Sequence, residues 1–348
     1  MPDIIRAAVS RILFAAVVVL ASFGVACGGG PSDGSSGPPT PPTAPTVPTE
    51  QVDGGQWGQR APLIEANSEL AFAELNGKLY LLGGYPASRL TAWTVQVYDI
   101  ASNRWELGPP LPQPNNHGMA AGVRGKVYLI GGQTTDAGNY VDTVYELDPG
   151  RGTWVEKARM PTARSSGVAI VHDGQIYVAG GRPPRGSDFA VYDPRSDSWQ
   201  VLPALATQRN HMTGAAIDGR IHVVGGRQGD GLSPLMTTAH EVFDPQTGAW
   251  TTAAPMLRAR SGMNGVMARG CFHVWGGEGP AGMFPDHDYY DPRADKWTRL
   301  RDMPIPVHGV YGSAFVEGVI WASGGGTSIG GNFGSSYNQV FLPSVGCD

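Results

Sequence analysis

The chain has 348 residues, of which 50 are Gly and 29 are Pro, and its formal net charge is −5. With 25 Lys and Arg against 30 Asp and Glu and no basic block, the sequence carries no electrostatic footprint for nucleic acid. Three cysteines are too few for a disulfide-rich scaffold, whereas an apolar fraction of 41% is ample for a hydrophobic core.

The N-terminal segment has the pattern of an export signal. Two arginines precede an apolar run over residues 12–26, which is shorter than the roughly 20 residues of a membrane span, and small residues lead to Cys27. The residues from Gly24 to Cys27 resemble a bacterial lipobox, in which the cysteine is lipidated, although Gly24 stands where Leu is usual. We expect a signal peptide over residues 1–26, a lipid anchor on Cys27, and a membrane-anchored protein on the periplasmic or outer side of the cell envelope. The alternative is an ordinary cleaved signal followed by an incidental cysteine.

A linker follows this signal. Residues 28–50 consist almost entirely of Gly, Pro, Ser and Thr, so they cannot bury enough apolar surface to fold. Their prolines favour an extended, semi-rigid form. We therefore expect a disordered spacer over residues 28–50, a folded domain over residues 51–343 and a short C-terminal tail over residues 344–348.

The rest of the sequence repeats itself about every 48 residues, a period typical of stacked or radially arranged units. Each unit contains a Gly-Gly pair, and the pairs are Gly83-Gly84, Gly131-Gly132, Gly180-Gly181, Gly225-Gly226, Gly276-Gly277 and Gly324-Gly325. Five units continue with an Asp and a later Trp, namely Asp99/Trp105, Asp148/Trp154, Asp193/Trp199, Asp244/Trp250 and Asp291/Trp297. Within a unit, apolar runs alternate with turn residues, and this pattern predicts four short antiparallel strands, as in a propeller blade.

The combination of a double Gly, a Tyr-Asp-Pro and a Trp six residues after the Asp resembles the kelch repeat. The resemblance covers about residues 57–342, and it departs from the pattern at Leu147 and Phe243. It implies an all-β, six-bladed kelch propeller with four antiparallel strands in each blade. The last unit has no Trp after Phe341, while Trp57 begins a fourth-strand sequence with no unit before it. We expect this N-terminal strand to complete the last blade and to close the ring, which removes exposed strand edges.

The recurring tryptophans have two interpretations. Large aromatic residues at a fixed register in every blade favour packing between blades, and an exposed platform for stacking against a sugar is the alternative. Trp93 has no counterpart in the other units and lies in a loop, so we expect it to be exposed.

A candidate ligand site lies in the loops that enter each innermost strand. Antiparallel order places these loops on the same face as the variable loops after the Gly-Gly pairs, where function usually resides. A column of residues nine positions before each hairpin turn is expected to ring the central opening, and it consists of Asn67, Asn115, Arg164, Arg209, Arg260 and His308. Together with His117 and His211, these residues predict a cationic mouth that binds a carboxylate or phosphate through arginine. The alternative is that the arginines bind carbonyl groups and neighbouring acids.

We expect a surface-tethered, monomeric module that recognises a protein or glycan partner over this loop face, without a cofactor or a metal. Kelch relatives suggest two enzymatic alternatives. Six-bladed bacterial members include sialic-acid mutarotases, and this resemblance would make Glu69 or His211 the acid/base group. Galactose oxidases have seven repeats, a copper ion and a Tyr cross-linked to Cys, which this sequence does not match. Three histidines at one rim can bind a metal, but scattered loop histidines are more often structural.

Two of the cysteines, Cys271 and Cys347, are expected on the face that carries the short hairpin turns. In an oxidising compartment they can pair and fasten the C-terminal tail. Two free thiols are the alternative.

Overall fold

The glycine-bounded apolar runs form short β-strands throughout the described part of the chain. The structure is a computed structural model, and it describes residues 51–136, 138–232 and 235–348. The expected signal peptide, Cys27 and the linker lie outside the described residues. Within those residues, no helix reaches the length and apolar character that crossing a membrane requires.

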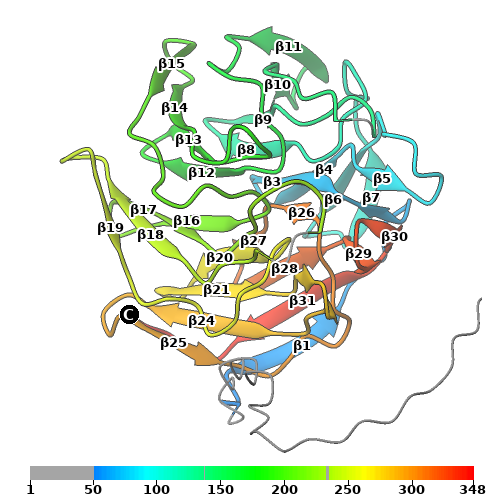
Figure 1. Cartoon of the computed structure of the whole chain (residues 1–348). Helices are drawn as coiled ribbons and strands as arrows, with labels where there is room; N and C mark the ends of the chain where they lie inside the picture. Colours follow the sequence, from blue (N-terminus) through cyan, green and yellow to red (C-terminus); the bar gives the residue numbers. More distant parts are fainter. Residues whose placement is uncertain (1–50, 137, 233–234) are drawn as a thin grey trace, which may run out of the picture. The chain divides into compact units, whose positions relative to one another are not determined.

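Six sheets, the blades of a propeller, are arranged about a central axis (Figure 1). Blade 1 consists of β3 (Leu70–Leu75), β4 (Lys78–Leu82), β6 (Val95–Asp99) and β7 (Arg104–Leu107). Blade 2 consists of β8 (Met119–Val123), β9 (Lys126–Ile130), β10 (Val144–Asp148) and β11 (Thr153–Lys157). Blade 3 consists of β12 (Val168–His172), β13 (Gln175–Ala179), β14 (Phe189–Asp193) and β15 (Ser198–Val201).

The second half of the ring repeats this plan. Blade 4 consists of β16 (Thr213–Ile217), β17 (Arg220–Val224), β18 (His240–Asp244) and β19 (Ala249–Thr252). Blade 5 consists of β20 (Asn264–Ala268), β21 (Cys271–Trp275), β24 (His287–Asp291) and β25 (Lys296–Arg299). Blade 6 consists of β27 (Ala314–Val316), β28 (Val319–Ser323), β31 (Asn338–Pro343) and β1 (Gly55–Gln59). The prediction of a six-bladed, all-β propeller is confirmed.

Blade 6 joins the two ends of the described chain. Strand β1 pairs antiparallel with β31, with Trp57 opposite Phe341, and the two strands lie side by side in Figure 1 in blue and red. Their aromatic rings are 5.2 Å apart between centroids. Because the N-terminal strand completes the last blade, the ring has no open sheet edge between its first and last repeats.

The connections between successive strands alternate between the two faces of the ring. On the face that we call the turn face, tight hairpins join the first and second strands of each blade, as at Asn76 and Gly77, which both have a left-handed backbone (φ 53° and 76°). The opposite face, which we call the loop face, carries the longer connections that follow the Gly-Gly pairs. Three of these connections form small ladders there: β2 (Asn67–Ser68) with β5 (Tyr85–Pro86), β22 (Glu278–Gly279) with β23 (Gly282–Met283), and β29 (Gly326–Ser328) with β30 (Asn332–Gly334).

The hydrophobic core lies between neighbouring blades rather than within them. One cluster, for example, packs Leu82 and Val97 of blade 1 against Leu129 and Leu147 of blade 2. The recurring tryptophans belong to this packing, and the indole N–H of Trp199, for instance, donates to the carbonyl of Ala158 in the preceding blade (2.8 Å). The interpretation of the tryptophan column as structural therefore agrees with the packing, whereas Trp93 is 52% exposed.

A disulfide in blade 5 and an interrupted strand in blade 6 depart from the plan of the other blades. Cys271 in β21 forms a disulfide with Cys347, so the C-terminal tail is fastened to blade 5. In blade 6 the innermost strand is interrupted at Gly312 (φ 133°), and its first part, β26 (Val310–Tyr311), pairs parallel with β3 of blade 1. This interruption adds one residue to the strand and carries Tyr311 toward the axis.

A closed circle of backbone hydrogen bonds surrounds the axis on the loop face. Each blade contributes one residue to this circle; we call these residues the axial ring, and they are Glu69, His117, Ser166, His211, Gly262 and Gly309. Each of the last five donates its N–H to the carbonyl of the ring member in the preceding blade. The bonds between successive members are 2.7–3.1 Å long, and the amide of Leu70 closes the circle onto Gly309 (3.2 Å). All six residues have a left-handed backbone, although four of them are not glycine.

Candidate functional site

A polar pocket of about 320 Å³ opens on the loop face at the axis. Its lining includes Glu69 and His117 of the axial ring, and it also includes Tyr85, Arg89, Gln133, Asp136, Tyr140, Arg182, Arg227, Asp230 and Glu278. A second cavity of about 340 Å³ follows the axis between the innermost strands, and small apolar residues form most of its wall. The titratable groups, and hence the chemistry, concentrate in the loop-face pocket.

One column of the repeat, the residue directly after each Gly-Gly pair, contributes five of the residues that line this pocket. This column contains Tyr85, Gln133, Arg182, Arg227 and Glu278, all of which line the pocket. The backbone of each residue is held against the entry loop of its own blade, as in the reciprocal bonds between Arg227 and Asn210 (2.9 Å each). We did not expect this column from the sequence, although its fixed place after the glycines is a signal that could have revealed it.

The charges of the pocket are arranged in opposite pairs. Arg227 contacts Glu278 through Nη1 and Oε1 at 2.6 Å. Longer contacts, of 3.6 Å and 3.7 Å, join Arg182 to Asp230 and Arg89 to Asp136. The pocket is therefore not the cationic mouth that the sequence suggested but a surface of alternating charge.

Two residues that line this pocket each carry a buried donor without a protein acceptor. Nε2 of Gln133 and Nε of Arg227 have no hydrogen-bond partner among the described residues, although the two side chains are only 3% and 4% exposed. A buried donor that stays unpaired costs about 1–3 kcal/mol. A ligand that brings oxygen acceptors to these two atoms would recover this free energy.

Two histidines of the axial ring hold arginines in place. Nδ1 of His117 lies 2.6 Å from Oδ1 of Asn116, so Nδ1 carries the proton, and Nε2 accepts from Nη2 of Arg182 at 3.2 Å. His211 repeats this arrangement with Asn210 (2.5 Å) and Arg227 (3.0 Å). Burial, aided by the nearby arginines, lowers the pKa of His117 to about 3 and that of His211 well below its usual value. Both imidazoles are therefore neutral near pH 7 and serve as acceptors.

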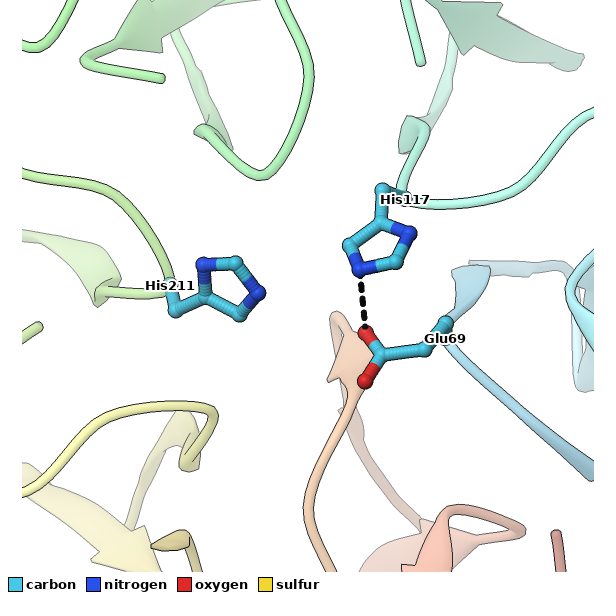
Figure 2. Close-up of side chains that lie close together, drawn as sticks. All are labelled: Glu69, His117 and His211. Atoms are coloured by element: carbon cyan, nitrogen blue, oxygen red, sulfur yellow. Dashed lines mark ion pairs between the residues drawn. The ribbon is translucent and has the colours of Figure 1, made fainter. Parts of the chain in front are cut away.

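Glu69 is the buried acid of the axial ring. Its carboxylate lies 3.1 Å from Nε2 of His117 (Figure 2) and 3.3 Å from Nε2 of His308, and it accepts a hydrogen bond from the hydroxyl of Tyr311 (2.8 Å). Burial alone would raise the pKa of Glu69, but the hydrogen bonds from His308 and Tyr311 and the charge of His308 lower it far below its usual range. Burial likewise opposes protonation of His308, yet the carboxylates of Glu69 and Glu278 raise its pKa above 6.5.

Glu69, His117 and His211 are also the residues that come nearest to a metal site. One ligand atom of each lies within 4.8 Å of the others, and Figure 2 shows His211 facing the Glu69–His117 pair across the axis. However, guanidinium groups already donate to Nε2 of both histidines. A divalent cation would need the same lone pairs and would lie beside two positive charges, so these donors do not fit a metal well.

The expectation that Arg164, Arg209 and Arg260 ring the opening is corrected by the structure. All three side chains are at most 1% exposed and none lines the pocket, because each turns into its own blade. Arg209, for example, donates to the carbonyls of Gly225 and Val223 and to Glu241. Asn67 and Asn115 play the same part, since their amide nitrogens donate to the first glycine of a Gly-Gly pair, Gly83 and Gly131 respectively. The alternative interpretation, in which the side chains of this column bind carbonyl groups and acids of the protein itself, therefore agrees with the structure.

His308 does not belong to that column. The amide of Gly277 bonds to the carbonyl of Val307, as the amide of Gly226 bonds to that of Arg260 one blade earlier. The extra residue in the innermost strand of blade 6 therefore shifts His308 by one position, so that it lies beside Glu69 and Glu278, fully buried. The structure brings together four of the predicted site residues, namely Glu69, His117, His211 and His308.

Comparison with known proteins adds a family and a fold. Residues 47–226 match the family model described as KLHDC2/KLHL20/DRC7 Kelch-repeats domain, and residues 208–257 match the Kelch motif. Kelch-like protein 7 of Rattus norvegicus is 39% identical over 184 residues, which cover 52% of this chain and 31% of that protein. Kelch-like protein terF of Aspergillus terreus is 34% identical over 101 residues, covering 28% of this chain and 22% of the relative. The chain thus spans less than a third of the length of either protein.

A solved structure, titled "Structure of YjhT", superposes with a TM-score of 0.67 and covers 81% of this chain and 96% of its own. At 17% sequence identity this likeness concerns the fold alone.

Proposed function

The chain belongs to the kelch-repeat family, and from this premise we propose that it is a binding module whose loop-face pocket receives a sugar unit of a glycan. The observation that carries the proposal is the pair of buried, unpartnered donors, Gln133 Nε2 and Arg227 Nε, in a polar pocket of about 320 Å³. A cavity of this size is at the lower end of the range for small-molecule sites.

A neutral, polyhydroxylated ligand matches the chemistry of the pocket. Each hydroxyl group both donates and accepts, so one molecule can accept from Gln133 and Arg227 while it donates to Glu278 and Asp136. Because the charges are already paired, such a ligand leaves no buried charge uncompensated, whereas an anion must compete with the resident carboxylates. This balance favours a neutral sugar over the acidic ligand that the sequence suggested.

Protonation equilibria favour binding over acid/base catalysis. A general acid or base works best when its pKa lies near the operating pH. The pKa of His117 is lowered to about 3, and those of Glu69 and His211 are also far below neutrality. His308, whose pKa is raised, is fully buried and does not line the pocket.

Isothermal titration calorimetry with glucose, mannose, galactose and N-acetylglucosamine tests this function. We expect at least one sugar to bind, and we expect Gln133→Ala and Arg182→Gln to weaken its binding about tenfold, since a hydrogen bond to a ligand is worth on the order of 1–2 kcal/mol. Arg195→Gln is the matched control, because Arg195 is exposed on the turn face. Binding that none of these pocket variants alters would contradict the proposed site.

One contact favours a second candidate, an isomerase that acts on an acidic sugar. Arg182 is 3.6 Å from Asp230, whose side chain is 63% exposed. A ligand carboxylate can therefore displace Asp230 from Arg182 more easily than it can displace the buried Glu278 from Arg227. Catalysed interconversion of the anomers of N-acetylneuraminic acid, followed by NMR and lost in Arg182→Gln, would support the enzyme. Binding of neutral sugars without turnover would support the module.

Export and anchoring through Cys27 remain part of the proposal. The support is the sequence pattern of residues 1–27 alone. Metabolic labelling with radioactive palmitate is expected to mark the protein, and Cys27→Ser is expected to remove the label. A labelled Cys27→Ser variant would contradict lipidation at this residue.

A further inference from the structure

The hairpin of β29 and β30 contributes Gly330 to the pocket and carries an exposed aromatic residue three positions later. Phe333 is 76% exposed, more than any other large hydrophobic side chain among the described residues. Leu90, the next most exposed at 73%, belongs to the loop of blade 1. A hydrogen bond from Nη1 of Arg89 to the carbonyl of Gly331 (2.9 Å) joins the two loops. Leu90 and Phe333 both lie close in sequence to this contact. Arg89 and Gly330 also line the pocket.

The backbone of Phe333 is strained. Its φ of 52° places it in the left-handed region, where a residue other than glycine loses about 1–2 kcal/mol. A bulky residue that is both strained and exposed has no packing benefit that offsets this cost. Such strain persists mainly where function requires a side chain in one position.

The hairpin that carries Phe333 is firmly attached to the axis. The amide of Gly330 donates to Oε2 of Glu278 (2.7 Å), and the hydroxyl of Ser68 donates to the carbonyl of Gly331 (3.0 Å). A Cβ on Gly331 would lie 2.8 Å from Oε1 of Glu69, so the turn of the hairpin rests directly on the axial acid. Phe333 is thus presented by a preorganised backbone, which lowers the entropic cost of a contact with a ligand.

We propose that Phe333 forms a second subsite, where its ring stacks against the sugar unit that adjoins the one in the pocket. The inference rests on the proposed function and names its ligand class as an oligosaccharide, because the hairpin that carries the exposed Phe333 also contributes Gly330 to the pocket. An aromatic ring offers a large apolar face, which suits the C–H face of a sugar ring. The hydroxyl groups of that unit remain in solvent, so the subsite needs no further polar partners.

The test compares the affinity of a monosaccharide with that of its tetrasaccharide, using glucose with cellotetraose and N-acetylglucosamine with chitotetraose. We expect the full protein to bind one tetrasaccharide about tenfold more tightly than its monosaccharide, the effect of roughly one aromatic contact. Phe333→Ser is expected to remove this difference without altering monosaccharide affinity, and Phe333→Trp to retain it. Val201→Ser, which changes another exposed apolar side chain (69% exposed), is the matched control.

The outcomes separate the subsite from the pocket. Equal affinities for the two ligand lengths in the unaltered protein, or a difference that survives Phe333→Ser, would overturn the subsite and leave the sugar pocket intact. Failure of every monosaccharide and tetrasaccharide to bind would overturn the proposed function itself. A lower melting temperature of Phe333→Ser does not affect the comparison, because both ligands are measured on the same variant.

Discussion

Nε2 of His211 lies 3.0 Å from Nη2 of Arg227, and the other ring nitrogen of His211 lies 2.5 Å from the amide oxygen of Asn210. The neutral imidazole therefore receives the guanidinium on one side and is fixed in its tautomer on the other. Arg227 is also bound to Glu278 and to Ser261, so three of its five N–H groups have protein partners, whereas its Nε has none. His211 therefore acts as a positioning residue for a guanidinium whose Nε remains for a ligand.

Replacing His211 tests this role. His211→Leu removes the acceptor, and we expect the affinity for a pocket ligand to fall about tenfold, because Arg227 loses one of the contacts that orient it. His211→Gln retains an oxygen acceptor and is expected to restore part of the affinity. Calorimetry and thermal unfolding of both variants distinguish an effect on the orientation of Arg227 from an effect on stability. If His211→Leu and His211→Gln lower the affinity equally, the orienting role is refuted.

Glycine is required at one position of the axial ring. A Cβ at Gly309 (φ 68°) would lie 2.7 Å from the carboxylate carbon of Glu69, whereas one at Gly219 (φ 77°) would meet no atom within 4 Å. We expect Gly219→Ala to cost only the left-handed strain, about 1–2 kcal/mol of unfolding free energy. Gly309→Ala should cost more and should also weaken ligand binding, because Glu69 must move. Unfolding in denaturant measures the free-energy cost of each of the two substitutions. Equal costs would show that the side chain of Glu69 moves aside without loss of stability.

Acid is expected to destabilise blades 4 and 5. Burial lowers the pKa of His222 to about 3, that of His240 to about 4 and that of His273 to about 3, from an ordinary value of 6.5, and it lowers that of His287 as well. Because these groups bind protons more tightly when the chain is unfolded, unfolding takes up protons, and stability falls as pH drops from about 6.5 toward 4. Each group contributes up to about 1.4 kcal/mol per pH unit.

The measurement is the unfolding free energy in denaturant between pH 7.5 and 4.5. Within blade 4, Nδ1 of His222 lies 2.9 Å from Nε2 of His240, and these two side chains pack together against Tyr290. With His117 and His211, six buried histidines have a lowered pKa, and the double variant His222→Phe/His240→Phe removes two of them, so its pH dependence should be about a third less steep. An unchanged slope would assign the acid sensitivity to other residues.

Closure of the ring predicts a specific effect of truncation. Without residues 51–63, the edge of β31 loses β1, and Phe341, which is fully buried, becomes exposed together with the backbone donors and acceptors of its strand. We expect size-exclusion chromatography to show association or aggregation of such a chain, while a chain that starts at Gln51 remains monomeric. A monomeric chain without residues 51–63 that keeps its melting temperature would contradict the role of β1 in closure.

Much of the fold could be predicted from the sequence because it repeats. The Gly-Gly pairs, the Asp/Trp spacing and the lone Trp57 indicate the number of blades and the strand that completes the last one, and the pairing of Trp57 with Phe341 confirms it. Periodic residues report on features that every blade shares.

The site was harder to predict because its chemistry is not periodic. Arg164, Arg209 and Arg260 are in register and charged, yet their side chains are long enough to turn back to carbonyls and acids of their own blades. Arg182 and Arg227 face the pocket instead, since the loops that carry them are pinned beside the axis. A one-residue insertion at Gly312 displaced His308 from its expected column, and no spacing rule reveals an insertion that falls inside a single strand.

The direction in which the chain enters the ring has a consequence for access. Strand β1 begins at Gly55 opposite Pro343, on the turn face, and the amide of Ser344 bonds to the carbonyl of Gly54 beside it. The loop-face pocket lies at the other end of the axis. An attachment made beside Gly54 and Ser344 therefore lies away from the pocket, so immobilisation there should leave the capacity for ligand undiminished.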